Sequence, residues 1–242
     1  MASREKDLVR VYRSLDWKTV YRMHALPAPT TPRSDHTAAL LRSRIIDGEF
    51  EPGRLLAESA MARELGVSRV PVREALFALE RDGLVSFSET GRAYVTALSP
   101  QDFDELYTLR LALEPLAARL ASPSLTSDAR LLEKNIKDTK RAKTMLDVTR
   151  LDLEFHEIIL EASGNGRLLK LWRSMRGELE LWLGRLHRRH QVQKLDTRAE
   201  TMHSHQTIVD CFKQQTPAAC EAFMRKHITG WREWLPVLPE SE

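Results

Sequence analysis

Side chains that ligate metals recur at helical spacing in the C-terminal half of this sequence. Asp152 and His156 stand one helical turn apart, so a helix would present both on the same side. His205 lies in the middle of an apolar helical stripe, whereas His203 points to the opposite face. Imidazole nitrogens combined with a carboxylate oxygen suit zinc, nickel or another borderline divalent metal. With His227, which lies on the apolar side of a later helix, these positions predict a divalent metal site formed by Asp152, His156, His205 and His227.

These groups also have ordinary structural interpretations. A single inward histidine is more often a hydrogen-bonded core residue than a ligand, and Asp152 with His156 alone is more often an ion pair. Three histidines and one acid that converge on one interior are harder to explain in this way. The residues alone therefore leave both the metal site and the structural alternatives open.

Two cationic side chains are predicted to point into the same interior. Arg110 and Arg176 each fall within the apolar stripe of a predicted helix. A buried arginine is unfavourable unless it is paired. One interpretation is an internal ion pair, for which Glu114 is the obvious partner of Arg110. The other is that one or both arginines bind the carboxylate of an organic acid beside the metal.

Helices must position these residues, because the segment from Ser99 to Pro236 is predicted to be entirely helical. Breaks are expected at Ser122-Pro123, Gly164-Asn165-Gly166 and Thr216-Pro217. Six antiparallel helices of this length form a bundle whose interior can hold a metal or a ligand. The predicted helices are residues 100–121, 126–146, 148–163, 167–190, 197–213 and 217–235.

The N-terminal half carries a second chemical pattern in residues 65–79, LGVSRVPVREALFAL. It predicts a tight turn at Gly66 and a helix entered through Ser68. Arg69 and Arg73 lie in the first turns of that helix and away from its apolar stripe. Arginines so placed suit a recognition helix, where they pair with guanine or clamp phosphates. An ordinary charged surface helix is the alternative.

The flanking segments favour the DNA-binding interpretation. A first helix over residues 34–50 and a short helix over 58–65 precede the recognition helix. Two short strands, 84–87 and 93–96, follow around a hairpin tip at 89–91. This is the order of a winged helix-turn-helix. The predicted DNA-contacting residues are Ser68, Arg69, Arg73 and, in the wing, Gly91 and Arg92.

The run that begins GEFEPG and continues through VSRVPVREAL to DGLV resembles the GntR family of bacterial regulators. The resemblance implies a homodimer that binds pseudo-palindromic double-stranded operator DNA. The chain departs from the family pattern at Ala57, where a capping Ser, Asn or Thr is usual, and at Ser59, where many relatives carry a third DNA-contacting arginine. The wing glycine, Gly91, is displaced by about one residue from its usual place.

A second resemblance covers the C-terminal half. The run DLEFHEIILEASGN, followed by His205 and RKHI, is similar to the ligand-sensing FCD domain of the FadR branch, in the six-helix, VanR-like form. In metal-binding members an Asp and three His at these positions hold a divalent metal, which implies that role for Asp152, His156, His205 and His227. Known effectors of such domains are mostly small carboxylates, which implies a similar effector here.

The distribution of charge limits how the chain can attract DNA. The chain has a net charge of +3, but residues 34–97 hold eight Arg against ten acidic residues, a net of −2. Attraction to phosphate must therefore come from local clustering. Residues 1–33 carry seven basic and three acidic residues, a net of +4, and include a Pro-rich linker. They are interpreted either as a tail or as a basic arm that adds DNA or partner contacts.

No apolar run is long enough to span a membrane, no signal peptide is evident, and two cysteines are too few for a disulfide framework. A cytoplasmic location is therefore expected. The expected organisation is mainly α. It comprises a basic extension and linker (1–33), a winged helix-turn-helix (34–97), a six-helix FCD-like bundle (98–236) and a tail (237–242).

These patterns predict a one-component transcriptional regulator, not an enzyme, whose operator affinity responds to a small carboxylate bound at the metal. A metal-dependent hydrolase with a DNA-binding appendage is one rival, but no inward acid is evident beside the predicted ligands to act as a general base. An architectural DNA-binding protein with a structural metal and no sensing function is the other. Effector identity, operator sequence and the sign of regulation do not follow from the sequence.

Overall fold

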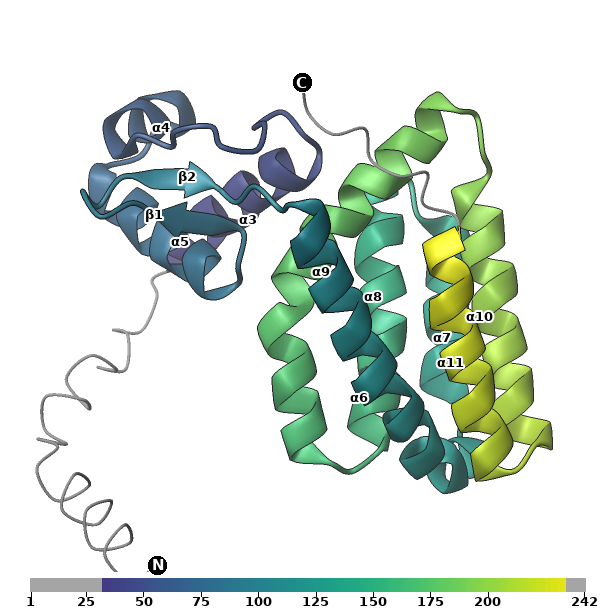
Figure 1. Cartoon of the computed structure of the whole chain (residues 1–242). Helices are drawn as coiled ribbons and strands as arrows, with labels where there is room; N and C mark the ends of the chain where they lie inside the picture. Colours follow the sequence, from purple (N-terminus) through teal and green to yellow (C-terminus); the bar gives the residue numbers. More distant parts are fainter. Residues whose placement is uncertain (1–31, 234–242) are drawn as a thin grey trace, which may run out of the picture. The chain divides into compact units, whose positions relative to one another are not determined.

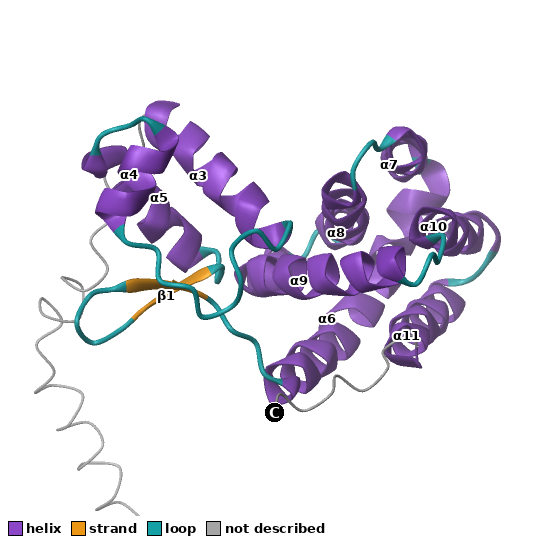
Figure 2. Cartoon of the chain, turned by 90° about the horizontal axis from the view of Figure 1, so that it is seen from above, coloured by secondary structure: helices purple, strands orange, loops and turns teal. Residues whose placement is uncertain are grey.

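The computed structural model describes residues 32–233. The predicted basic extension, apart from its last residues, and the predicted tail lie outside the described residues. In the described part, a small domain of helices with a two-stranded sheet precedes a set of longer helices (Figures 1 and 2). The predicted fold class is confirmed. No helix between residues 32 and 233 is both long and apolar enough to cross a membrane.

The N-terminal domain has the predicted winged helix-turn-helix order. The antiparallel strands pair Val85 with Val95 and Phe87 with Ala93, and an isolated bridge joins Leu55 to Tyr94. The sheet edge is thereby tied to the segment before the second helix. The elements are α3 (Pro32–Ile46), α4 (Glu58–Leu65), α5 (Arg69–Arg81), β1 (Val85–Phe87) and β2 (Ala93–Val95).

The amphipathic pattern of α5 fixes which of its faces is exposed. The predicted apolar stripe is fully buried in the core of this domain: Val72, Ala75, Leu76 and Leu79 are at most 1% exposed. Gly66 ends α4 in a left-handed conformation with φ 66°, which a glycine adopts without strain, so the chain turns sharply into α5. The face of α5 opposite the stripe is left for solvent.

Six helices follow in the described part of the chain, as predicted. α6 packs against α8, α9, α10 and α11, and α10 packs against both α7 and α11. Figure 2 shows α7, α8 and α10 nearly end-on, side by side. The helices are α6 (Pro100–Ser127), α7 (Arg130–Arg141), α8 (Met145–Ala162), α9 (Gly166–Val192), α10 (Thr197–Gln214) and α11 (Pro217–Glu233).

The predicted break at Ser122-Pro123 is wrong, because α6 continues to Ser127. Pro123 cannot donate a backbone hydrogen bond, but the turn around it is held by tertiary packing. Ser122 and Leu125 are buried in the bundle, and the Thr126 hydroxyl lies 2.7 Å from the backbone oxygens of Ser122 and Phe212. These contacts outweigh the local preference for ending the helix.

Polar caps set where the site-bearing helices begin. The Thr144 side chain accepts from the backbone of Asp147 at the start of α8. Asn165 accepts from two backbone N–H groups at the start of α9, and Asp196 accepts from Ala199 at the start of α10. Each cap satisfies a donor that the first turn leaves unpaired. The caps of α8, α9 and α10 therefore determine the residue at which each of these helices begins.

Candidate metal centre and DNA-binding surface

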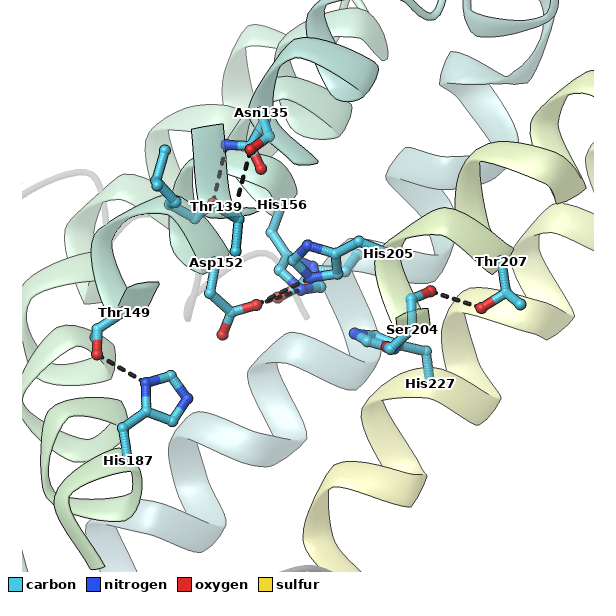
Figure 3. A network of polar contacts seen from close by, with 12 residues as sticks. Asn135, Thr139, Thr149, Asp152, His156, His187, Ser204, His205, Thr207 and His227 are labelled. Atoms are coloured by element: carbon cyan, nitrogen blue, oxygen red, sulfur yellow. Dashed lines mark hydrogen bonds and ion pairs between the residues drawn. The ribbon is translucent and has the colours of Figure 1, made fainter. Parts of the chain in front are cut away.

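Three histidines from three helices converge in the bundle (Figure 3). His156 on α8, His205 on α10 and His227 on α11 each offer a ring nitrogen, and these nitrogens lie within 4.8 Å of one another. Asp152 lies one turn before His156, and its Oδ1 is 2.9 Å from Nε2 of His205 and 3.9 Å from Nε2 of His156. The structure thus brings together all four predicted ligands.

The protonation states of these groups are those that metal binding requires. Burial alone raises the pKa of Asp152, but contact with His205 and the charges of nearby histidines outweigh burial and hold this pKa well below its usual range. Burial lowers the pKa of His205 in spite of Asp152, and burial together with His156 lowers the pKa of His227 well below its usual value. At neutral pH Asp152 is therefore a carboxylate, and His205 and His227 are neutral imidazoles.

A buried carboxylate, Glu114 of α6, lies directly behind His156. Its Oε2 is 2.7 Å from Nδ1 of His156, and its side chain is fully shielded from solvent. Trp172 donates to Oε1 at 3.0 Å and Arg110 donates to the same oxygen at 2.6 Å. Burial raises the pKa of Glu114, but the charges of Arg110 and His156 outweigh burial, so the pKa falls far below its ordinary value. Glu114 is therefore a carboxylate.

The expectation that no second acid lies inward beside the ligands is wrong, because Glu114 touches His156. Its spacing of four residues from Arg110 was visible in the sequence and pointed to the ion pair. Its approach to His156 depends on how α6 and α8 pack, which periodicity along one helix does not specify.

The donor set fits a divalent metal. Nδ1 of His156 faces Glu114, and Nδ1 of His227 lies 2.8 Å from the Ser204 hydroxyl, so Nε2 of each ring lies on the side away from these partners. Nε2 of His156 also lies 3.4 Å from Nη2 of Arg110. His205 is 1% exposed, yet neither of its ring nitrogens forms a well-aligned hydrogen bond with any residue that the structure describes. A buried imidazole without such a bond is unfavourable unless something else binds it. A metal between Asp152 and the histidines would supply that partner.

A cavity of about 340 Å³ opens beside this centre. Its walls come mainly from α9, α10 and α11, and Asp152, His205 and His227 are part of its lining. His187 and Lys226 also line it, and sequence reasoning did not single out either residue. The cavity is large enough for a small organic acid.

The two arginines predicted to bind the effector do not line this cavity. Arg110 is buried as predicted, but it forms the ion pair with Glu114, and its Nη2 is 3.4 Å from Nε2 of His156. The prediction that Arg176 points inward is wrong: its side chain is 34% exposed and pairs with Glu157 at 3.2 Å. Among the described residues that line the cavity, neither arginine appears. Arg176 lies near the edge of the apolar stripe of α9, where a small rotation moves a side chain to the surface.

The predicted DNA-contacting residues are all exposed. Ser68 is the N-cap of α5 and Arg69 its first residue. Gly91, with φ 72°, shapes the hairpin tip, so the wing projects Arg92 into solvent. Arg73 is 61% exposed and forms two hydrogen bonds with Glu58 of α4, at 2.7 and 2.8 Å. Glu58 thus holds the Arg73 guanidinium on the exposed side of α5.

A winged helix-turn-helix followed by a helical bundle is the architecture of a DNA-binding transcriptional regulator. Comparison with known proteins agrees: residues 33–95 match the bacterial regulatory proteins of the gntR family, and residues 105–230 match the FCD domain. The chain therefore belongs to the GntR family of transcriptional regulators and carries an FCD domain. It is a regulator, not an enzyme.

Individual relatives of this chain are also named as transcriptional regulators or repressors. The Nta operon transcriptional regulator of Aminobacter aminovorans is 30% identical over 74% of this chain and 83% of its own length. The gluconate operon transcriptional repressor of Bacillus licheniformis is 27% identical over 73% of this chain and 74% of its own length. An uncharacterized HTH-type regulator of Bacillus subtilis, YdhC, is 35% identical over 54% of this chain, a match that spans 61% of that relative.

Solved structures support the fold. McbR/YncC of E. coli has a TM-score of 0.62 at 20% identity, over 84% of this chain and 96% of that one. A GntR-type regulator from Rhodococcus sp. RHA1 has a TM-score of 0.60 at 23% identity, over 84% of this chain and 97% of that one. At these identities the likeness concerns architecture alone.

Proposed function

We propose that this regulator binds a divalent metal through Asp152, His156, His205 and His227, and that a small carboxylate bound beside the metal changes its affinity for operator DNA. The observation that carries the proposal is the convergence of three imidazoles and a carboxylate on one buried point at the wall of a cavity. Zinc or nickel suits this set of nitrogen and oxygen donors.

The cavity supports a carboxylate as effector. A divalent metal held by four protein ligands supplies positive charge and accepts a further oxygen ligand from the cavity side. Lys226 lines the same cavity and adds a cation that can meet a second carboxylate oxygen. In this proposal Lys226, which lines the cavity, pairs with the effector carboxylate in place of Arg110 and Arg176.

DNA binding is assigned to α5 and the wing, in a homodimer on a pseudo-palindromic operator. The exposure of Arg69, Arg73 and Arg92 supports contacts of α5 in the major groove and of the wing with the DNA backbone. Support for a dimer comes from an exposed apolar stripe on α6, where Leu109, Leu116 and Leu120 are 41–50% exposed. A second copy of the chain that covers this stripe would bring two recognition helices into one complex.

Metal analysis tests the first part of the proposal. The purified protein is expected to hold about one divalent ion per chain and to melt at a lower temperature after chelation. His205→Ala and His227→Ala should each lose the ion. His203→Ala is the matched control, because His203 is an exposed neighbour on α10, and it should retain the ion. Metal-free protein prepared without chelator would refute the site.

Operator binding in the presence of small acids tests the second part. The panel should include gluconate, because two relatives are named as repressors of a gluconate operon. An effector should raise the melting temperature of the metal-loaded protein, shift operator affinity about 5- to 150-fold, and do neither after chelation. An acid that binds without changing operator affinity would favour the architectural alternative.

A further inference from the structure

His187 of α9 is a cavity wall residue that the metal site does not use. It is 2% exposed and lines the same cavity as Asp152, His205 and His227 (Figure 3). Its Nδ1 lies 2.8 Å from the hydroxyl oxygen of Thr149 on α8. Because Thr149 is fully buried, this hydrogen bond is shielded from water and fixes the ring.

The Thr149 hydroxyl determines where the proton of His187 resides. That hydroxyl donates to the backbone oxygen of Met145, one turn earlier in α8, at 2.9 Å. A threonine hydroxyl carries one hydrogen, and a carbonyl oxygen only accepts. The hydroxyl is therefore already used as a donor and must accept from His187. Nδ1 thus bears the hydrogen, and Nε2 is left as a lone-pair acceptor.

The ring stays neutral under ordinary conditions. Burial lowers the pKa of His187 to about 4, against the attraction of Asp152, which raises it. A neutral imidazole with hydrogen on Nδ1 offers the cavity an acceptor and no donor. Such an acceptor repels a carboxylate oxygen but binds a hydroxyl or amine hydrogen.

We propose that His187 is a specificity-determining residue of the effector cavity, selecting acids that carry a hydroxyl group in addition to the carboxylate. This inference rests on the proposed function, because it concerns the ligand of the same cavity. An acid without the hydroxyl would leave Nε2 of His187 buried and unpaired, since the ligand displaces the water that otherwise satisfies it. A hydrogen bond from the hydroxyl to His187 would add to any preference that chelation of the metal by a hydroxyl oxygen gives.

Matched pairs of acids test this inference on the full-length, metal-loaded protein. Lactate with propionate, malate with succinate, and citrate with tricarballylate each differ by one hydroxyl. For the pairs that bind, titration calorimetry should show the hydroxy acid binding roughly 5- to 100-fold more tightly. In His187→Phe, which keeps a flat ring and leaves the bond from Thr149 to Met145 intact, the ratio should fall about 5-fold or more, to the preference that chelation of the metal alone gives. An unchanged ratio in this variant would overturn the role of His187.

The control variant is His36→Phe, which replaces an exposed histidine of α3 that is not among the residues lining the cavity, and it should keep the wild-type ratio. Thr149→Val removes only the hydroxyl and should reduce the ratio by freeing the ring to exchange tautomers. Neutron diffraction from the unsubstituted protein provides a measurement that needs no variant, and it should place the hydrogen on Nδ1 of His187.

The failures of the two proposals are distinguishable. Acids that bind with no preference for the hydroxyl would overturn the role of His187 and leave the carboxylate effector standing. A hydrogen on Nε2, or two metal ions per chain with the second lost in His187→Phe, would also overturn it. No binding by any acid would overturn the proposed function, and this inference with it.

Discussion

Glu114→Gln should weaken metal binding although Glu114 is not a ligand. Three donors face its two oxygens: Arg110 and Trp172 meet Oε1, and His156 lies 2.7 Å from Oε2. A carboxylate accepts from all of them, whereas a glutamine offers one oxygen and turns its amide hydrogens toward one side. If the amide faces His156, Nδ1 must become the acceptor and Nε2 takes the hydrogen, which blocks metal ligation.

The expected loss in metal affinity is about 10- to 100-fold, the usual effect of removing a group that orients a ligating histidine. The substitution also removes the carboxylate that pairs with buried Arg110, which is expected to destabilise the fold by about 3–5 kcal/mol. The double variant Arg110→Met, Glu114→Gln separates the effects, because it removes the charge that Glu114 balances and should recover stability but not affinity. The assay is competition with a chromophoric chelator at neutral pH.

Glu221→Gln is the matched control, because Glu221 is a partly exposed carboxylate on α11 paired with Arg119 at 3.2 Å. It should bind the metal as tightly as the unsubstituted protein. If Glu114→Gln also retains that affinity, Glu114 does not orient His156, and the reasoning is refuted. A loss in the single variant that is fully reversed in the double variant would assign the effect to stability alone.

The pH dependence of stability follows from the same carboxylate. The pKa of Glu114 is held far below its ordinary value of 4.5, so its stabilising contribution is fully present above that pH. The contribution is lost as the pH falls from 4.5 through the depressed folded-state pKa. The difference in metal-free melting temperature between the unsubstituted protein and Glu114→Gln should therefore shrink below about pH 4.5. A difference that stays constant down to pH 3 would contradict this linkage.

Three further outcomes are expected. Arg69→Ala and Arg73→Ala should each weaken binding to the specific operator by about 1–3 kcal/mol in fluorescence anisotropy, with less effect on random DNA; equal losses on both would assign that arginine to phosphate contact. Cys211 and Cys220 should resist alkylation in the folded protein at pH 8. Both thiols are buried, and burial together with the neighbouring thiol raises the pKa of Cys211 to about 12. Rapid labelling would contradict this. Deletion of residues 1–31, which leaves α3 intact, should flatten the salt dependence of DNA binding if that basic segment contacts phosphates.

Patterns within one helix predicted most of the architecture. The apolar spacing of residues 72–79 and the glycine at position 66 identified α5 and its entry turn, and α4 has the predicted bounds. The same angular argument gave His205 as buried and His203 as exposed, as observed, although both residues line the cavity. Such patterns succeed because a side chain's face depends only on its own helix. They failed at Pro123, where packing between helices outweighs the local preference.

What the sequence did not predict are contacts that depend on the alignment of one helix against another. Glu114 reaches His156 because α6 packs beside α8. Thr149 reaches His187 because α8 packs beside α9. Neither pair has a spacing that could reveal it, since the partners lie 42 and 38 residues apart. Periodicity indicates which residues point inward, but it does not indicate which inward residues meet.

These contacts between helices have a common chemical consequence. Glu114, Ser204 and Thr149 each lie against Nδ1 of a histidine, respectively His156, His227 and His187. A ring whose hydrogen lies on Nδ1 directs its Nε2 lone pair away from that partner and offers the interior an acceptor in place of a donor. Lone pairs and the Asp152 carboxylate repel an anion, so recognition of a carboxylate there depends on added positive charge. Under the proposed function a divalent metal would supply that charge where the ligands converge, with Lys226 at the cavity wall, so metal binding and carboxylate recognition would depend on the same arrangement of tautomers.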